Sequence, residues 1–170
     1  MKTMNEMRLV FASRSANEGF ARSAVSAFVA QLDPAVDELA DLRTAVSEAV
    51  TNCIVHAYKD TIGDIFINVQ LFENGRVTVR VRDRGCGIPD IRRAMEPLYT
   101  TDDTGERSGM GFAIMQSFMD KVKVKSAHGK GTTVELRKTF SAALSAKTAA
   151  AETQAVSTTE KSTDGREGIA

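Results

Sequence analysis

Three polar residues, Glu48, Asn52 and His56, follow one another at intervals of four. At about 100° per residue, this spacing places their side chains on one narrow stripe of a helix. Apolar residues flank the stripe, so the carboxylate and the amide lie at the margin of the apolar face and can form the floor of a pocket. The alternative is an ordinary exposed glutamate and an asparagine that contacts a neighbouring helix.

A glycine-rich segment, Asp83-Arg84-Gly85-Cys86-Gly87, comes directly after a run of alternating apolar residues. Glycines let the backbone approach a flat ligand closely, and the Asp83 carboxylate can accept a hydrogen bond from an amino group. The segment therefore has the chemistry to bind a planar, amine-bearing ring. A plain turn at the end of a strand is the alternative.

A second glycine-rich segment, 105–111, runs into a predicted helix. The unpaired amide groups and positive dipole end of a helix suit an anion such as a triphosphate. The segment is no Walker loop, because no Gly-Lys-Ser/Thr follows, and no dinucleotide fingerprint, because no strand precedes it. Gly-x-Gly before a helix is weak evidence alone, so the order of all three segments carries the interpretation.

Hydrophobic periodicity predicts the elements that hold these segments. A strand over 8–12 precedes a helix that Ser15 or Asn17 caps and Asp33-Pro34 ends. Its apolar face is expected at Phe20, Ala24, Phe28 and Leu32, with Ala21, Val25 and Val29 beside it. A second helix over 37–58 carries the polar stripe and a buried face made of Leu39, Leu42, Val46, Val50, Cys53 and Ile54.

From Ile65 the hydrophobic period changes to two, which predicts a hairpin that turns at Asn74-Gly75. Residues 96–109 lack a hydrophobic period and are interpreted as a mobile loop. A helix from Gly111 and a second hairpin over 122–137 follow. This order predicts a two-layer α/β sandwich, with helices on one face of a mixed, mostly antiparallel sheet. We expect an ordered domain over 1–140 and a disordered tail over 141–170, which lacks aromatic residues.

The composition limits the classes of function. The chain has 22 Lys+Arg and 22 Asp+Glu, so no global field draws it to nucleic acid or anionic lipid. Cys53, Cys86, His56 and His128 form no zinc or dithiol pattern, and two packed thiols in a reducing compartment are the simpler interpretation. The sequence contains no signal-peptide pattern and no apolar run of about 20 residues. We expect a cytoplasmic protein.

Four strings occur in a fixed order: Glu48-Ala49-Val50-Thr51-Asn52, Asp83-x-Gly85-x-Gly87, Gly109-Met110-Gly111 and Gly131-Thr132-Thr133. They resemble the N-box, the two glycine boxes and the closing Gly-Thr motif of the ATPases and kinases that share the Bergerat-type fold of DNA gyrase, Hsp90, sensor histidine kinases and MutL. Within that family, the short chain resembles the anti-sigma-factor serine kinases from about residue 5 to 138. The strings that indicate this group are 46–52, 96–101 and 106–112.

The resemblance implies a role for each motif residue. Asp83 would bind the adenine amino group, with Gly85, Gly87 and Thr132 completing the pocket. Asn52 would hold Mg²⁺ through its amide oxygen, and Glu48 would be the general base. The lid and phosphate cradle would comprise Thr100, Thr101, Arg107, Ser108, Gly109, Met110 and Gly111.

Some of these residues have a simpler alternative. Arg107 would neutralise charge near the γ-phosphate, but a solvated loop charge is a close rival. His56 is interpreted as a packed structural histidine. The sequence does not decide the reactivity of Cys86.

The resemblance also implies partners: a sporulation sigma factor that the chain binds and blocks, an anti-anti-sigma protein whose serine receives the phosphate from Mg-ATP, and a second copy of the chain in a homodimer. Arg22 is the candidate partner contact, with a plain surface arginine as the alternative. Three other functions remain open: a histidine-kinase ATPase domain, a general-stress anti-sigma kinase, and a non-catalytic module that sequesters its partner. A phosphoacceptor histidine segment before the N-box is missing, which argues against the first.

Overall fold

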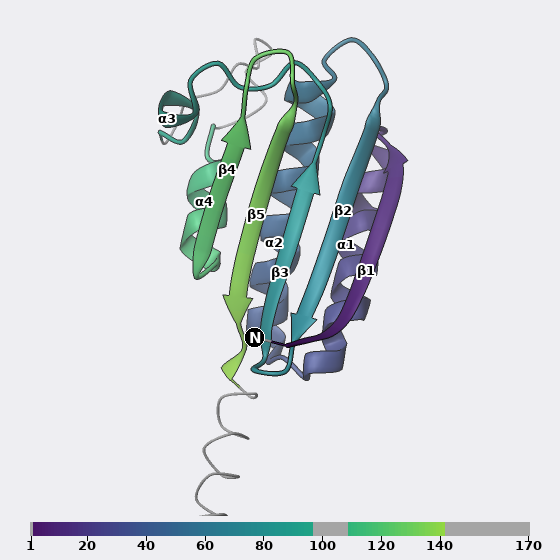
Figure 1. The fold of residues 1–170 in the computed structure, drawn as a ribbon, viewed down its shortest axis with the longest axis vertical. Helices are drawn as coiled ribbons and strands as arrows, with labels where there is room; N and C mark the ends of the chain where they lie inside the picture. Colours follow the sequence, from purple (N-terminus) through teal and green to yellow (C-terminus); the bar gives the residue numbers. More distant parts are fainter. Residues whose placement is uncertain (1, 97–108, 142–170) are drawn as a thin grey trace, which may run out of the picture.

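Five strands form one sheet in the order β1-β2-β3-β5-β4 (Figure 1). The computed structural model describes residues 2–96 and 109–141. The strands are β1 Thr3–Ala12, β2 Asp64–Phe72, β3 Arg76–Arg82, β4 Lys121–Ser126 and β5 Thr132–Thr139. The helices are α1 Ala16–Val29, η1 Ala30–Leu32, α2 Val36–Asn52, the π-helical η2 Cys53–Ala57, α3 Ile91–Ala94 and α4 Gly111–Phe118.

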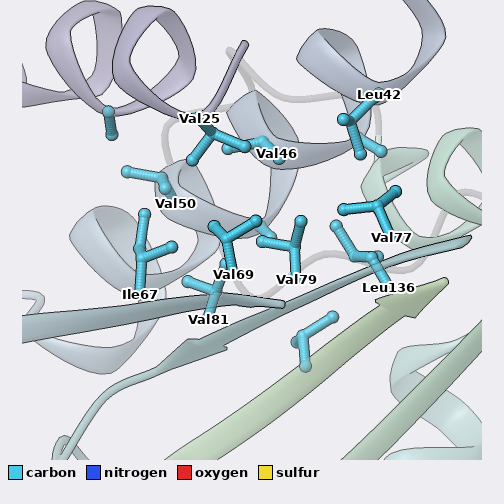
Figure 2. Packing of buried hydrophobic residues seen from close by; sticks show 14 of the residues in the cluster. Val25, Leu42, Val46, Val50, Ile67, Val69, Val77, Val79, Val81 and Leu136 are labelled. Carbon is cyan, nitrogen blue, oxygen red and sulfur yellow. The ribbon is translucent and has the colours of Figure 1, made fainter. Parts of the chain in front are cut away.

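Helices α1, α2 and α4 lie on the same side of the sheet, and the opposite face carries no helix of residues 2–96 and 109–141 (Figure 1). The core fills the space between these two layers. Valines dominate it: Val25, Val46 and Val50 of the helices face Val69, Val79 and Val81 of the strands (Figure 2). The predicted two-layer α/β sandwich is therefore confirmed.

Every neighbouring pair of strands described in the sheet is antiparallel. The predicted mixed sheet is wrong in this respect, because the helical connection between the first two strands joins antiparallel strands. Two consecutive helices, α1 and α2, bring the chain back so that β2 runs opposite to β1. Strands β3 and β4 run the same way, but β5 lies between them and opposes both.

The β2–β3 hairpin has a three-residue loop, Glu73–Gly75, in which only Gly75 has positive φ, at 77°. The amide of Gly75 donates to the Phe72 carbonyl at 2.9 Å. This is a type I turn closed by a left-handed glycine, and not the two-residue turn that Asn-Gly favours. The predicted hairpin is correct, although its turn is one residue longer.

Two details of the helical layer correct the sequence analysis. The buried face of α1 is Ala21, Val25 and Val29, whereas Phe20 is 55% exposed and packs edge-on against Phe11 at 6.3 Å between ring centroids. Both sets repeat every four residues and form adjacent stripes of the helix, so the spacing alone does not show which stripe is buried. The second helix ends its α-helical part at Asn52 and continues as a π-helical turn, before the predicted end at Tyr58.

The side-chain hydrogen bond expected at the N-terminus of α1 is not formed. Ser15 occupies the N-cap position of α1 without a capping hydrogen bond, and the Asn17 amide instead donates to the Ala12 carbonyl at 2.9 Å. That bond fastens the helix to the end of β1. Most of the predicted tail, 142–170, lies outside the described residues.

Candidate functional site

The C-terminal end of α2, the end of β3, the start of α4 and the start of β5 surround one cavity of about 1250 Å³. Eight of the predicted site residues line it: Glu48, Asn52, Asp83, Gly87, Gly109, Met110, Gly111 and Thr132. The antiparallel order explains the convergence, because β3 ends beside the place where β5 begins. Segments that are more than 80 residues apart along the chain thus form one site.

Asp83 is the most buried charged residue of this cavity, at 2% exposure. Its Oδ1 accepts hydrogen bonds from the backbone amides of Gly85 at 2.9 Å and Thr132 at 3.1 Å. Burial raises the pKa of this carboxyl, while the two amide donors act in the opposite direction. The first glycine box and the Gly-Thr motif are therefore joined through one carboxylate.

Three glycines allow the backbone segments around Asp83 to touch. A Cβ at Gly85 would lie 2.1 Å from the Ala57 carbonyl oxygen, and one at Gly131 would lie 2.3 Å from the carbonyl oxygen of Asp83. At Gly87, where φ is +71°, a Cβ would lie 2.1 Å from the Ala127 carbonyl oxygen. Only glycine fits these approaches. Gly85 does not line the cavity itself but lets the loop pack against η2.

The second glycine box lies directly against the polar stripe of α2. A Cβ at Gly111 would lie 2.9 Å from Glu48 Oε2 and 3.5 Å from Asn52 Oδ1. The N-terminal end of α4 is thus within contact distance of the Glu48 and Asn52 side chains. A carboxylate, a hard amide oxygen and a helix N-terminus at one place suit a metal-bound phosphate group.

Two residues that were not predicted from the sequence, Ser126 and Tyr58, support the glycine loop. Ser126 Oγ accepts from the Ile88 amide at 2.7 Å, donates to the Gly131 carbonyl at 2.9 Å and lies 2.9 Å from Thr132 Oγ1. The Tyr58 hydroxyl accepts from the Arg84 amide and donates to the Asp64 carbonyl, both at 2.8 Å. A serine in a strand of alternating lysines and a tyrosine at a helix end carry no sequence signal of these contacts.

His56 and Cys86 are neighbours in the cavity wall. The Cys86 thiol donates to the His56 carbonyl at 3.1 Å, and the Cys86 amide donates to the Ala57 carbonyl at 3.1 Å. Both residues line the cavity, and Cys86 is exposed.

The remaining predicted residues lie elsewhere. Arg22 is on α1, outside the cavity wall, with its Nε 3.8 Å from Glu18 Oε1 and its side chain 44% exposed. Thr100, Thr101, Arg107 and Ser108 lie outside the described residues. Their predicted place in the lid therefore stays a prediction.

Among residues 2–96 and 109–141, no group of three or more His, Cys, Asp or Glu side chains could hold a metal ion without other ligands. The Asn52 amide oxygen fits a Mg²⁺ ion that takes its other ligands from phosphate and water. None of the helices in this described part is long and apolar enough to cross a membrane.

Comparison with known proteins agrees with this geometry. A model of the histidine kinase-like ATPase domain matches residues 11–138. The anti-sigma F factor of Caldanaerobacter subterraneus subsp. tengcongensis is 54% identical over 81% of this chain and 96% of its own, and that of Geobacillus kaustophilus is 58% identical over 79% and 92%.

A solved structure shows the same fold at low identity. The RsbU and RsbW domains of a Mycobacterium tuberculosis protein superpose with a TM-score of 0.59 at 19% identity, over 81% of this chain and 33% of that one. The described fold, the motifs and the close relatives agree. The chain therefore belongs to the family of histidine kinase-like ATPase domains and, within it, to the anti-sigma F factors.

Proposed function

We propose that this chain is an anti-sigma factor and a protein serine kinase, which binds Mg-ATP in the cavity and phosphorylates an anti-anti-sigma protein. One observation carries the proposal: a single cavity is lined both by Asp83 and by Glu48, Asn52 and Gly111. A base-binding carboxylate and a phosphate-binding group are the two things that a nucleotide site needs. The cavity exceeds the volume of many small-molecule sites, which span roughly 300–1,000 Å³.

The proposed roles follow from the atoms. Asp83 accepts a hydrogen bond from the adenine amino group, beside Gly87 and Thr132. Asn52 would hold Mg²⁺ through its amide oxygen, and the ion would supply positive charge that offsets the charge of the phosphates. Gly109, Met110 and Gly111 offer backbone amides at the start of α4, and we place Thr100, Thr101, Arg107 and Ser108 in the lid over the phosphates.

The transfer step needs a base near the γ-phosphate. Glu48 Oε2 lies beside Gly111, at the N-terminus of α4, so its carboxylate is on the phosphate side of the site. It takes the proton from the acceptor serine hydroxyl as the serine oxygen bonds to the γ-phosphorus. The bond from that phosphorus to the β–γ bridging oxygen breaks, and ADP leaves with the electron pair.

The anti-sigma role rests on the relatives, which are named anti-sigma F factors and match 92–96% of their own length. We propose that the chain holds a sporulation sigma factor away from RNA polymerase in the cytoplasm, and that it works as a homodimer. Arg22 is the proposed partner contact, because its side chain is 44% exposed at the margin of the buried face of α1.

Transfer of labelled γ-phosphate from Mg-ATP to the anti-anti-sigma protein tests the proposal. The controls are an acceptor with its serine changed to alanine and the kinase variant Glu48→Gln. We expect the first to abolish transfer and the second to lower it by roughly 10²–10⁴-fold with ATP binding retained. ATP binding without transfer would instead indicate a sequestering module, and co-purification with a general-stress sigma factor would indicate the other anti-sigma kinases.

A further inference from the structure

We propose that Cys53 is a positioning residue for base recognition: its thiol donates a hydrogen bond to Asp83 Oδ2 and holds the carboxylate in the orientation that adenine requires. The sulfur lies 3.6 Å from that oxygen. The inference rests on the proposed binding of adenine at Asp83. It adds a residue of the second helix to a pocket that the motifs assign to the glycine loops.

The local backbone explains why Cys53 faces the pocket. Cys53 follows Asn52 directly and is the first residue of the π-helical turn η2. A π-helical turn is wider than an α-helical one and often occurs at functional sites. The side chain of Cys53 is 4% exposed, yet the residue lines the cavity together with Asp83. It therefore lies between the hydrophobic core and the cavity in which adenine is proposed to bind.

The donors to Asp83 are divided unequally between its two oxygens. Oδ1 accepts from the backbone amides of Gly85 and Thr132, whereas the donor recorded for Oδ2 in the described chain is the Cys53 thiol. A carboxylate oxygen has about two lone-pair sites. One thiol therefore leaves Oδ2 one acceptor site, which the exocyclic amino group of adenine can occupy.

A thiol suits this position better than a stronger polar group. The thiol is buried beside the Asp83 carboxylate, and it offers one S–H donor to a group that in its charged form can only accept. A thiol is also a small apolar group that packs in the core without needing a second partner. An ordinary core cysteine would share the burial but not the contact with a functional carboxylate.

The contact has a consequence for nucleotide selectivity. Adenine presents an amino group where guanine presents a carbonyl oxygen, and that oxygen would face an anionic acceptor. Donors on both oxygens hold the Asp83 carboxylate in one rotamer, and this fixed orientation increases the preference for ATP over GTP. Without the thiol, the carboxylate gains rotational freedom, and ATP loses more affinity than GTP.

Two substitutions separate the proton of the thiol from its volume. Cys53→Val removes the donor and adds one heavy atom to the side chain, while Cys53→Ser keeps a donor and removes volume. We expect Cys53→Val to bind ATP about three- to tenfold more weakly, the usual effect of one modest hydrogen bond, with GTP binding unchanged. Cys53→Ser should retain most of the preference for ATP. Equal affinities in Cys53→Val and the unsubstituted protein would overturn the inference, as would equal losses in both variants.

Infrared spectroscopy of the unsubstituted protein provides a readout that does not depend on either variant's folding. The Cys53 S–H stretch, identified by its loss in Cys53→Val, should lie at the low frequency of a hydrogen-bonded thiol and shift on Asp83→Asn. A band at the frequency of a free thiol, unmoved by Asp83→Asn, would refute the contact. If the unsubstituted protein failed to prefer ATP at all, the proposed function would fail; an ATP preference that ignores Cys53 would remove only this inference.

Discussion

At the scale of single residues, Asp83 combines a proposed binding role with an effect on stability. Its carboxylate is 2% exposed, and the burial raises its pKa although two backbone amides donate to it. The charged form is therefore less favourable in the folded protein than in the unfolded chain. The protein keeps it, we infer, because only the charged form is a strong acceptor for the adenine amino group.

Asp83→Asn should therefore separate the two properties. An asparagine can still accept from the Gly85 and Thr132 amides, but its other polar atom is a donor and meets the adenine amino group unfavourably. We expect ATP affinity to fall by about 1.5–3 kcal/mol, measured by calorimetric titration, with GTP affected less. Asp64→Asn, on an exposed aspartate at the start of β2, is the matched control and should bind ATP normally. Equal affinities of the unsubstituted protein for ATP and GTP would contradict the assigned pocket.

The same carboxyl predicts a pH dependence of stability. Between the ordinary pKa of 3.8 and its raised value, Asp83 is protonated in the folded protein and ionised in the unfolded chain. The folded state then binds more protons, so the contribution of Asp83 to the free energy of unfolding increases as pH falls through this window. Urea titrations without nucleotide should show this increase for the unsubstituted protein relative to Asp83→Asn. A difference that is constant with pH would mean that the carboxyl is not buried as described.

The sequence predicted those site residues whose chemistry is visible in their type and spacing. Glu48, Asn52 and Asp83 belong to patterns, and all three line the cavity. Ser126, Tyr58 and Cys53 escaped because their contacts depend on tertiary register: Ser126 meets Ile88 across 38 residues, and Cys53 meets Asp83 across 30. Nothing in a single sequence marks a buried thiol as a donor to a particular carboxylate.

At the scale of elements, the loops around the proposed adenine pocket depend on close backbone contact. Gly87 and Gly129 share φ = +71°, but a Cβ at Gly87 would overlap the Ala127 carbonyl, while one at Gly129 would meet nothing within 4 Å. We expect Gly129→Ala to cost about 1–2 kcal/mol for the left-handed conformation alone. Gly87→Ala should cost about 2–5 kcal/mol, because overpacking adds to that strain. Urea unfolding measures both, and equal costs would mean that the loop and β4–β5 turn are not in contact.

The start of α4 gives a second matched pair. A Cβ at Gly111 would lie 2.9 Å from Glu48 Oε2, the end of a flexible side chain, whereas Gly19 in α1 has open space. Either substitution by alanine should stabilise its helix by up to about 0.5–1 kcal/mol. Gly111→Ala should nevertheless lower phosphate transfer by about tenfold to a hundredfold, because the added methyl group displaces the Glu48 carboxylate, the proposed general base. Gly19→Ala should leave phosphate transfer unchanged. Normal phosphate transfer in Gly111→Ala would mean that the start of α4 does not position the Glu48 carboxylate.

The elements themselves were predicted where the periodicity was strong. The β2–β3 hairpin and the helix carrying Glu48 were expected at nearly their observed bounds. The π-helical turn after α2 was not, because a change to bonds between residues five apart leaves no signature in the sequence. The last carbonyl of this turn, that of Ala57, accepts from the Cys86 amide. The exposed Phe20 was misassigned because α1 packs through small residues, Ala21 among them, which a hydrophobicity pattern ranks below phenylalanine.

At the scale of the whole molecule, the sandwich closes at Phe140. This side chain is fully buried in the core, and its amide donates to the Gly75 carbonyl at 3.1 Å. The next amide, of Ser141, donates to Glu38 Oε1 at 3.0 Å, on the first turn of α2. The last strand is thus fastened to the β2–β3 turn and to the helical layer before the described chain ends.

Removal of residues 142–170 should therefore leave the melting temperature and phosphate transfer unchanged. The cut lies beyond Ser141 and so keeps both terminal hydrogen bonds, as well as the whole of residues 11–138 that the family model matches. Phe140→Ala in the full chain is the contrasting variant. It should cost about 3–5 kcal/mol, the usual effect of emptying a buried aromatic position. Calorimetric melting of the two proteins decides the matter: a truncation that melts as early as Phe140→Ala would mean that the segment after Ser141 contributes to the core, and that the domain extends beyond residue 140.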